Sequence, residues 1–297
     1  MTTIHIEGMG WLGSALAHAL HRDGIDFTWH DIATPVNSWQ ASTGMVYPAG
    51  DARSTHNLHA WHTWANTNLF PPGTVTPCAW AYINKKPPYK ANHTHTNLGW
   101  ANIAHATAYA VDAPAVVNTA RHKFAHARRE APPNRAPLVR AHGFHARRTS
   151  YIWGWSAPVR LHFPANLTKA TPELPVALYG RAHRWAMAYA YPIPSRPGWH
   201  WAGSSLVRQG TPRYGNITGA LERWKTNFTQ LFPRVEVKEI QPPTHGWRPK
   251  PDNTDPQHLT QPTPEVLEFP PLWHSGIRWA PQLVEQAVAW CAKEAAR

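Results

Sequence analysis

The sequence predicts an α/β protein in which a parallel-sheet unit is combined with an antiparallel sheet. Two observations predict this class. A β-rich segment near the start runs through three closely spaced glycines into an apolar helical segment, and a second β-rich segment follows. In the middle of the chain, several segments rich in Trp, Tyr and Val alternate in the way of half-buried strands. The 30 prolines exclude a long helical bundle.

The first fifty residues have the order strand, glycine turn, helix, strand and acid. Residues 2–7 (TTIHIE) alternate as a strand does, and residues 14–21 (SALAHALH) carry Leu and Ala at helical spacing before a helix stop at Asp23. Residues 25–30 (IDFTWH) then read as a second strand, directly before Asp31. This order is typical of a unit that binds a dinucleotide.

Each part of the glycine turn has a physical role. Gly8 makes the tight turn, Gly10 lets the backbone approach a pyrophosphate, and Gly13 lets the helix pack close to the sheet. The N–H groups at the helix N-terminus attract the phosphates, and the final acid accepts hydrogen bonds from a ribose. The residues expected to bind the dinucleotide are Gly8, Gly10, Trp11, Leu12, Gly13 and Asp31.

A loop of small residues follows the second strand. Residues 41–48 read Ala-Ser-Thr-Gly-Met-Val-Tyr-Pro. This loop resembles the one that wraps the flavin in the D-amino-acid-oxidase-like FAD-dependent oxidoreductases, a family that includes glycine oxidase. It also resembles the Gly-x-x-Tyr-Pro run in the oxidoreductase domain of the bifunctional enzyme that modifies tRNA wobble uridines. The resemblance implies a Rossmann-like FAD-binding domain with FAD as cofactor. The loop residues that it implies at the site are Ser42, Thr43, Gly44, Met45 and, on the catalytic side, Tyr47.

A middle block meets a further demand of the resemblance. Residues 112–121 read as a helix with an acidic start and an early proline, and residues 136–140 (APLVR) read as a short strand. Ala141-His142-Gly143 then resembles the Ala-x-Gly turn that lies beneath the flavin in the family. His142 departs from the small or hydroxyl residue that is usual there. The resemblance implies that Ala141 and Gly143 contact the cofactor.

Near the far end, Gly246-Trp247-Arg248-Pro249 resembles the family's Gly-x-Arg-Pro motif. In glycine oxidase and its relatives this arginine holds the substrate carboxylate beside the flavin. A guanidinium suits that role because it is always charged and grips a carboxylate through two parallel hydrogen bonds. The resemblance therefore implies that Arg248 is the substrate carboxylate clamp.

The last stretch resembles a glycine-containing loop that opens the family's C-terminal helix. Residues 273–281 (WHSGIRWAP) are similar to the tRNA enzyme's Ser-Arg-Gly-x-x-x-Ala-Pro pattern, although they contain less glycine, and residues 282–295 form an amphipathic helix. The resemblance implies that a helix N-terminus at Gly276 faces the flavin O2 edge and stabilises negative charge on the reduced ring. The residues that it implies at the cofactor are Ser275, Gly276, Ile277 and Arg278, with Gly276 also on the catalytic side.

The remaining segments predict a substrate domain with an antiparallel sheet. Strands are expected at residues 151–163, 177–180, 185–194 and 200–207, and a helix at residues 220–232. The expected division is a discontinuous FAD-binding domain at residues 1–50, 105–150 and 244–297, and an interleaved substrate domain at residues 51–104 and 151–243.

Metal and hydrolase chemistry have little support in the sequence. His56, His59 and His62 recur at spacing three, and His122 and His126 at spacing four, but no HExxH and no pair of cysteines accompanies them. No metal site is therefore expected, and the missing G-x-S-x-G and P-loop patterns exclude hydrolases and phosphate-transfer enzymes of those classes.

The net charge of +12 favours an acidic partner such as DNA or RNA. Basic residues crowd one stretch, either as a solvated face or as a surface that contacts a phosphate backbone; they are Arg121, Lys123, Arg128, Arg129, Arg135, Arg140, Arg147 and Arg148. The two cysteines, Cys78 and Cys291, cannot form a disulfide framework, so a cytoplasmic location is expected. The longest apolar runs fall short of a membrane span, so no membrane partner is expected.

Together these observations predict an FAD-dependent amine oxidoreductase that oxidises the C–N bond of a glycine-type amine, with dioxygen as the electron acceptor. Two substrates stay open: a glycyl group carried on a base of DNA or tRNA, and a free small amino acid such as glycine or an N-alkyl glycine. The alternatives from other classes are a non-catalytic nucleic-acid-binding protein with a flavin-type fold and an NAD-dependent reductase.

Overall fold

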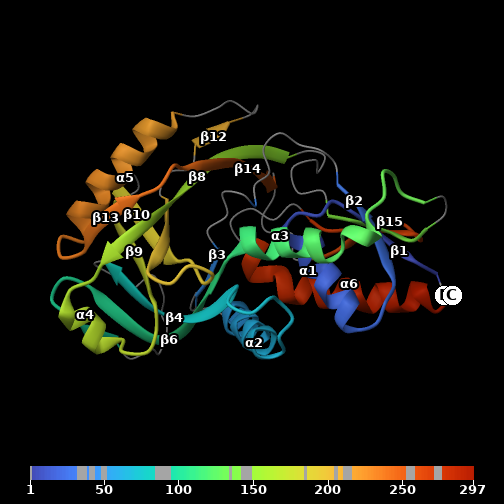
Figure 1. The fold of residues 1–297 in the computed structure, drawn as a ribbon, viewed down its shortest axis with the longest axis horizontal. Helices are drawn as coiled ribbons and strands as arrows, with labels where there is room; N and C mark the ends of the chain where they lie inside the picture. Colours follow the sequence, from blue (N-terminus) through green and yellow to red (C-terminus); the bar gives the residue numbers. More distant parts are fainter. Residues whose placement is uncertain are drawn as a thin grey trace.

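The computed structural model describes residues 2–31, 39, 44–47, 52–83, 95–133, 136–141, 149–183, 186–203, 207–209, 216–251, 258–270 and 276–297. Within these residues the strands form one sheet of 5 strands and one of 11 strands. Figure 1 shows the two sheets at opposite ends of an elongated molecule, with the two chain ends side by side at the end of the smaller sheet. Thr2 N–H donates to the carbonyl of Ala295 at 3.3 Å there.

The smaller sheet is built around the expected first strand. Its order is β15 (Thr260–Thr263), β16 (Val266–Glu268), β7 (Leu138–Arg140), β1 (Ile4–Glu7) and β2 (Phe27–His30). β1 is parallel to both β2 and β7, and β16 is parallel to β7. The strands expected at residues 2–7, 25–30 and 136–140 are confirmed, whereas the hairpin of β15 and β16 was not expected.

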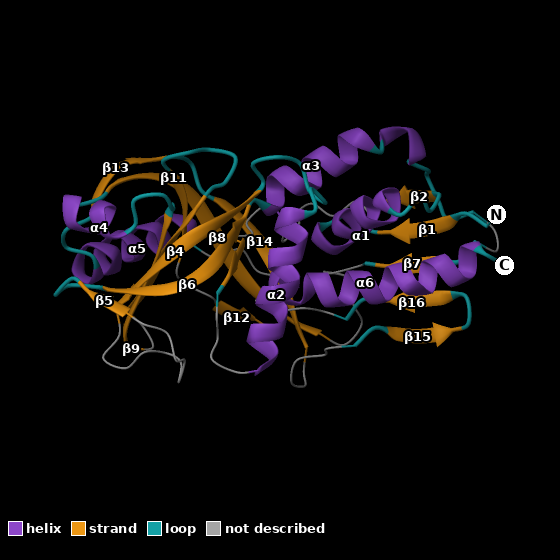
Figure 2. Cartoon of the chain, turned by 90° about the horizontal axis from the view of Figure 1, so that it is seen from below, coloured by secondary structure: helices purple, strands orange, loops and turns teal. Residues whose placement is uncertain are grey.

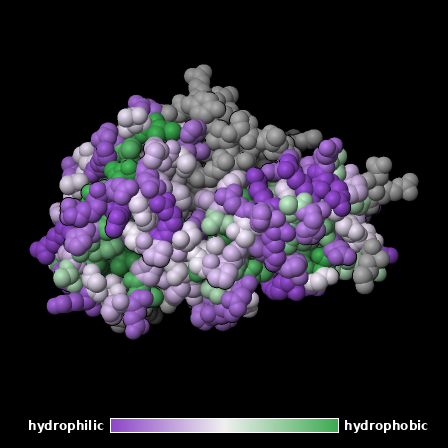
Figure 3. All heavy atoms as spheres, viewed as in Figure 1, coloured by the Kyte–Doolittle hydropathy of each residue, from purple (hydrophilic) through white to green (hydrophobic). Residues whose placement is uncertain are grey.

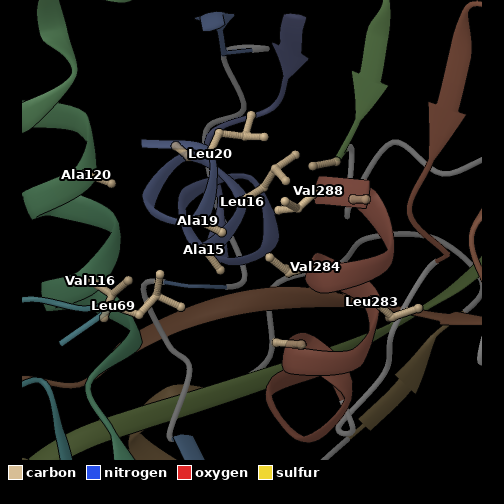
Figure 4. Close-up of a cluster of buried hydrophobic side chains, with 14 of the residues drawn as sticks. Ala15, Leu16, Ala19, Leu20, Leu69, Val116, Ala120, Leu283, Val284 and Val288 are labelled. Atoms are coloured by element: carbon tan, nitrogen blue, oxygen red, sulfur yellow. The ribbon is translucent and has the colours of Figure 1, made fainter. Parts of the chain in front are cut away.

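Three helices cover this sheet: α1 (Trp11–Arg22), α3 (Ala113–Lys123) and α6 (Gly276–Ala295). Figure 4 shows their apolar side chains meeting in one cluster. The fully buried members include Leu16, Leu20, Val116, Leu283 and Val284. The acidic start expected for the middle helix is confirmed, because the side chain of Asp112 accepts a hydrogen bond from the Ala115 N–H at 3.1 Å.

The C-terminal helix begins six residues before the expected segment at 282–295 and contains Pro281. Proline has no N–H to donate to the carbonyl four residues earlier, which is that of Ile277. The indole Nε1 of Trp61 donates to this carbonyl instead, at 3.0 Å. Trp61 belongs to α2 (Ala52–Asn66), which crosses the start of α6 in Figure 2. A tertiary contact therefore allows the helix to continue through the proline.

The larger sheet has the strand path β12, β8, β11, β10, β9, β4, β6, β3. The bounds along this path are β12 (Val207–Gln209), β8 (Thr149–His162), β11 (Trp199–Gly203), β10 (Ala186–Pro192), β9 (Val176–His183), β4 (Val75–Ile83), β6 (Asn102–Val111) and β3 (Gly44–Val46). β13 (Glu236–Ile240) and β14 (Thr244–Pro251) pair with β8, and β5 (His95–Asn97) pairs with β6. The pairs are antiparallel except β4 with β9.

One side of the larger sheet, the core face, packs against α5 (Ile217–Leu231), while α4 (Ala165–Ala170) lies at its edge. The helix expected at residues 220–232 is confirmed as α5, and the strands expected at 151–163, 177–180 and 185–194 as β8, β9 and β10. The strand expected at 200–207 corresponds to β11, and residues 204–206 lie outside the described residues.

The expected domain division does not coincide with the division of the strands into two sheets. Three stretches that the expected division assigns to the FAD-binding domain hydrogen-bond within the larger sheet: β3, residues 105–111 of β6, and β14. The division stays a prediction. No helix among the described residues is long and apolar enough to cross a membrane.

Candidate cofactor and substrate site

The glycine turn after β1 has the geometry that close packing requires. Gly8 has a φ of 99°, a region that favours glycine. A Cβ on Gly13 would lie 1.9 Å from the carbonyl oxygen of Gly8, so only glycine fits at that position. A Cβ on Gly10 would have Trp39 Cδ1, at 3.7 Å, as its nearest contact, so the backbone of Gly10 is open to close approach. This cradle suits a pyrophosphate.

Two helix N-termini meet next to this turn. α1 has no side-chain cap at Gly10, and neither α1 nor α6 has an acidic residue in its first turn. Trp11, the first residue of α1, stacks on Trp61 with ring centroids 6.3 Å apart, and Trp61 in turn bonds Ile277 at the start of α6. The positive ends of two helix dipoles therefore lie near each other, which favours a negatively charged ligand.

Asp31, the expected ribose acceptor, is held against the glycine turn. Its carboxylate accepts a hydrogen bond from the Met9 N–H at 3.1 Å and forms a short ion pair with Arg121. Arg121 also donates to the Met9 carbonyl at 3.2 Å, and its guanidinium lies 5.0 Å from the centre of the Trp39 ring. The sequence indicated only that Arg121 lies in a basic stretch. Its contacts with Asp31 and Met9 depend on the packing of α3 beside α1.

The ends of the parallel strands carry a buried polar network. His5 is fully buried and bonds Thr28 Oγ1 at 2.8 Å and His30 Nδ1 at 2.7 Å. Arg140 donates to Glu7 at 3.1 Å. Burial, followed by the neighbouring His30, lowers the pKa of His5 to about 4, so the His5 ring is neutral at neutral pH.

The start of β3 packs against the start of α6. A Cβ on Gly44 would lie 2.4 Å from the Val111 carbonyl oxygen and 2.8 Å from Ile277 Cδ1, so glycine is required there. Tyr47 stacks on Trp80 with centroids 4.9 Å apart, and the guanidinium of Arg278 lies 5.1 Å from the Tyr47 ring. Tyr47, Gly44, Ile277 and Arg278 are thus brought together, and their contacts with the flavin stay a prediction.

The side of the larger sheet opposite α5 carries hydroxyl-bearing aromatic rings, and we call it the tyrosine face. Its members are Tyr82, Tyr179, Tyr189 and Tyr191, from three adjacent strands. Tyr82 pairs in register with Tyr179, and Tyr179 with Tyr189, while Tyr189 and Tyr191 stack at 4.6 Å. Burial raises the pKa of Tyr82 and of Tyr179, which keeps both hydroxyls protonated. Sequence reasoning had counted Tyr179, Tyr189 and Tyr191 only as strand formers and had not singled out Tyr82.

Strand register puts the position of Arg248 on the tyrosine face. In β14, Arg248 pairs with Ile152, and two pairs farther along Thr244 pairs with Ser156, without interruption. Ser156 and Thr244 bring their hydroxyl oxygens to 3.3 Å. His245, one position away, contacts Trp153 on the core face. Alternation therefore assigns positions 244, 246 and 248 to the opposite side.

The structure describes three of the remaining residues that were expected at the cofactor. Ala141 is buried and its N–H donates to the Glu7 carbonyl at 2.8 Å, so it continues β7 beside β1. Leu12 packs on the core of the smaller sheet, and Met45 packs on the tyrosine face. The expected contacts at Ser42, Thr43, Gly143 and Ser275 lie outside the described residues, as does His142.

Among the histidines considered for metal binding, His62 has other partners, and the side chain of His56 lies outside the described residues. His62 Nδ1 bonds the Tyr109 hydroxyl at 2.7 Å, and its Nε2 bonds Asn66 at 3.1 Å. Across the described parts of the chain, no three His, Cys, Asp or Glu side chains are grouped so that they could hold a metal ion.

Comparison with known proteins shows the fold. No protein-family model matches the sequence, and a search of curated proteins finds no match either. Among solved structures, glycine oxidase from Geobacillus kaustophilus superposes with a TM-score of 0.71 at 13% identity, over 98% of this chain and 95% of the other. Iminodiacetate oxidase from Chelativorans sp. BNC1 gives 0.69 at 14% identity, over 98% and 95%. L-alpha-glycerophosphate oxidase from Mycoplasma pneumoniae, with FAD bound, gives 0.70 at 13% identity, over 98% and 94%.

The chain therefore has a mixed α/β fold with a Rossmann-like unit, which confirms the predicted fold class. It is the fold of the D-amino-acid-oxidase-like FAD oxidoreductases that the sequence resembles.

Proposed function

We propose that the protein is an FAD-dependent amine oxidoreductase that oxidises the C–N bond of a glycine-type amine. The observation that carries the proposal is the convergence of three features in one fold. The open glycine turn, two helix N-termini without an acidic residue in their first turns and the tyrosine face are joined by the contacts of Trp61, Ile277 and Tyr47. The solved oxidases of the same fold support it.

The residues present fit the cofactor. Gly10 leaves room for a pyrophosphate, and the N-termini of α1 and α6 supply N–H donors and positive potential. Asp31 keeps carboxylate oxygens beside the turn for a ribose, with Arg121 balancing its charge. We propose contacts from Ser42, Thr43, Gly143 and Ser275 as well. When bound, FAD would supply the acceptor for the hydride that leaves the substrate carbon.

The tyrosine face would form the substrate side. Arg248 would hold the substrate carboxylate through two parallel hydrogen bonds, and the protonated hydroxyls of Tyr82 and Tyr179 would complete a polar lining. An amine that arrives neutral needs no general base on the protein, so the work of the chain is to bind, orient and exclude water. Dioxygen is the proposed electron acceptor.

The first experiment is an absorbance spectrum of the purified protein, which we expect to be yellow. Arg248→Ala should lower kcat/KM for glycine or an N-alkyl glycine by about 100-fold, because a charge-assisted pair is removed, and should leave the flavin content unchanged. Arg223→Ala, at an exposed position on α5, is the control and should change neither. A colourless protein that binds NAD would instead support the reductase alternative. Unchanged turnover in Arg248→Ala would contradict the clamp.

We further propose that the amine is a glycyl group carried on a base of DNA or RNA. A cluster of exposed basic and imidazole side chains, the basic α3 surface, favours this substrate over a free amino acid. Its members come from α1, α3 and the segment after α3; they are His21, His122, Lys123, His126, Arg128 and Arg129. Figure 3 shows hydrophilic residues gathered over the region that Figure 1 assigns to α3.

The test is the salt dependence of binding to a DNA or RNA duplex. Affinity should fall steeply between low and moderate salt, and Lys123→Glu with Arg128→Glu should reduce the slope by about 2, one for each phosphate that is no longer neutralised. The control is the double variant Lys169→Glu with Arg223→Glu. It makes the same charge change on α4 and α5, beside the larger sheet. Binding that is flat with salt would leave the free amino acid as the substrate. Binding to nucleic acid without flavin turnover would favour the non-catalytic alternative.

The proposal also includes a cellular location and a domain division. Both cysteines are free and buried, and burial raises the pKa of each thiol to about 12, which is compatible with the proposed cytoplasmic location. The division into a discontinuous FAD-binding domain and a substrate domain is also proposed, with the larger sheet as the scaffold that both share.

A further inference from the structure

Asn57 on α2 is fully buried, and both its amide nitrogen and its amide oxygen lack a hydrogen-bond partner in the described structure. An amide in this state is costly, because its hydrogen bonds to water are lost and none replaces them. Buried asparagines in native proteins are nearly always bonded, so the exception calls for a partner that is not part of the chain.

The neighbours of Asn57 on α2 locate it. Asn57, Trp61 and Trp64 recur at helical spacing and share one side of the helix. Trp64 Nε1 donates to Glu285 at 2.9 Å, and Trp61 Nε1 donates to the Ile277 carbonyl at 3.0 Å. Going from Trp64 back to Trp61 is one turn of α2, and it moves the bonded position on α6 from Glu285 back to Ile277, which is two turns. Asn57 lies one turn beyond Trp61, and Ile277 is already the second residue of α6, so the same progression aims Asn57 past the N-terminus of α6.

The surroundings favour a ligand rich in acceptor oxygens. The first turn of α6 contains no acidic residue, so no carboxylate within that turn offsets the positive end of the helix dipole. The indole Nε1 of Trp11, at the start of α1, is also buried without a partner, and Trp11 stacks on Trp61. Buried donors that lack acceptors thus adjoin the starts of both helices.

We propose that Asn57 hydrogen-bonds the FAD cofactor at the start of α6. An amide both donates and accepts, so it suits the carbonyl, imide and hydroxyl groups that a flavin and its ribityl chain present. The inference rests on the proposed FAD function and adds a residue that neither the glycine turn nor the motif resemblance indicated. Asn57 acts as a binding residue; the hydride chemistry does not need it.

The test is a titration of flavin-stripped protein with FAD, followed by protein fluorescence, for the wild type and Asn57→Leu. The leucine has a similar volume but cannot hydrogen-bond. We expect the Kd for FAD to rise about tenfold or more, the loss of one or two hydrogen bonds. The flavin-free variant should melt at a higher temperature than the flavin-free wild type, because an unpaired buried amide has been removed.

His18→Leu is the matched control. His18 is also buried with an unpartnered ring nitrogen, but it lies two turns along α1 from Trp11, where it packs between Phe70 and Phe124. It should raise the melting temperature of the flavin-free protein without changing the Kd for FAD. If Asn57→Leu does not fold, Asn57→Ala removes the amide without adding bulk and is interpreted in the same way.

The outcomes separate this inference from the proposed function. A wild-type protein that binds no FAD would overturn the proposed function, and the inference with it. A wild-type protein that binds FAD, beside an Asn57→Leu variant of equal affinity, would overturn the inference alone. Equal loss of affinity in His18→Leu would also overturn it, since the effect would then be one of general packing.

Discussion

The two faces of the larger sheet are made by alternate residues of the same strands, yet they differ in chemistry. In β8, Trp153 and Trp155 point to the core face, while Ser156 lies on the tyrosine face. In β9 and β10, Leu178 and Ala190 pack under α5, whereas Tyr179 lies on the other side. The core face is packed by helix side chains, and the aromatic cluster of the tyrosine face is formed by strand residues and Tyr47.

The difference teaches that one strand pattern can serve two purposes. The rings of Trp153, Trp155 and Trp224 stabilise the fold by burial on the core face, and we propose that the hydroxyl-bearing rings of the tyrosine face serve a ligand. Substitutions on the core face should therefore change the free energy of unfolding. Substitutions on the tyrosine face should change ligand binding or turnover.

The largest effect is expected for Trp224→Ala on α5. Trp224 is fully buried against the core face, stacks on Phe228 at 4.7 Å, and donates its Nε1–H to the Tyr189 carbonyl at 3.1 Å. The cavity and the missing hydrogen bond should lower the free energy of unfolding by about 3–5 kcal/mol in urea denaturation. Tyr179→Phe, on the other face, should change it by less than about 1 kcal/mol. Equal decreases in the free energy of unfolding for Trp224→Ala and Tyr179→Phe would contradict the difference between the two faces.

Acid should weaken the core face through His200, whose Nε2 lies 3.1 Å from the Val176 carbonyl oxygen. Burial lowers the pKa of His200 to about 4, from 6.5 in the unfolded chain. The unfolded state therefore binds more protons between these values. The stabilisation is complete above about pH 6.5 and is lost as the pH falls toward 4.

Urea denaturation at several pH values measures this loss. His200 should account for about 2 kcal/mol between about pH 8 and about pH 5. His200→Gln keeps a donor for the Val176 carbonyl but does not titrate, so its unfolding free energy should fall less over this range. His5 and His18 add losses of the same sign, because burial lowers the pKa of each to about 4. Parallel pH profiles for wild type and His200→Gln would disprove the assignment.

Two Gly→Ala substitutions, one on each face of the larger sheet, test how tightly each face is packed by adding a single methyl group. A Cβ on Gly180 would lie 3.1 Å from Leu231 and Phe232 on the core face. Gly180→Ala should lower the unfolding free energy by about 1 kcal/mol, since packed side chains must move. A Cβ on Gly203 would lie 2.2 Å from the hydroxyl oxygen and 2.6 Å from Cζ of Tyr189, so the half-buried Tyr189 ring would have to move.

Gly203→Ala should therefore leave stability within about 0.5 kcal/mol and displace the Tyr189 ring instead. The measurement is the KM of the amine substrate, which should rise while the melting temperature stays constant. The opposite assignment, a destabilised Gly203→Ala with unchanged KM, would show that the tyrosine face is packed as a core.

The smallest effect is expected for the thiols. Cys78 lies on the tyrosine face but is fully buried, and burial raises the pKa of its thiol to about 12. A thiol-specific reagent should not react with the native protein at neutral pH within the time that the unfolded chain needs to react completely. Fast reaction of Cys78 would show that the tyrosine face is open to solvent as far as β4.

The elements that the sequence predicted best are those whose signals are local. The strand, glycine turn and helix at the start, the acidic cap at Asp112, and the Trp-rich strands of the larger sheet all follow from neighbouring residues. β4 and β6 escaped prediction because both contain several alanines, which are depleted in strands, and Pro77 argues against a strand in β4. Long-range pairing decides their conformation. The early start of α6 escaped because Pro281 suggested a boundary that Trp61 overrides.

The candidate site shows the same division. The glycines at 8, 10 and 13 and the arginine at 248 stand in motifs, which are short because the backbone geometry that they serve is local. Asn57 and Tyr189 stand in no motif.

The sequence by itself determined that a glycine turn joins the first strand to the first helix, that the sheet strands alternate, and that basic residues exceed acidic ones. Only the tertiary structure decided that Arg121 closes on Asp31, that the starts of α1 and α6 meet at Trp61, and that one face of a sheet carries the tyrosines. The physical reason is range. Hydrogen-bond and φ preferences act between neighbours in the chain, whereas desolvation and packing act between residues that only folding brings together.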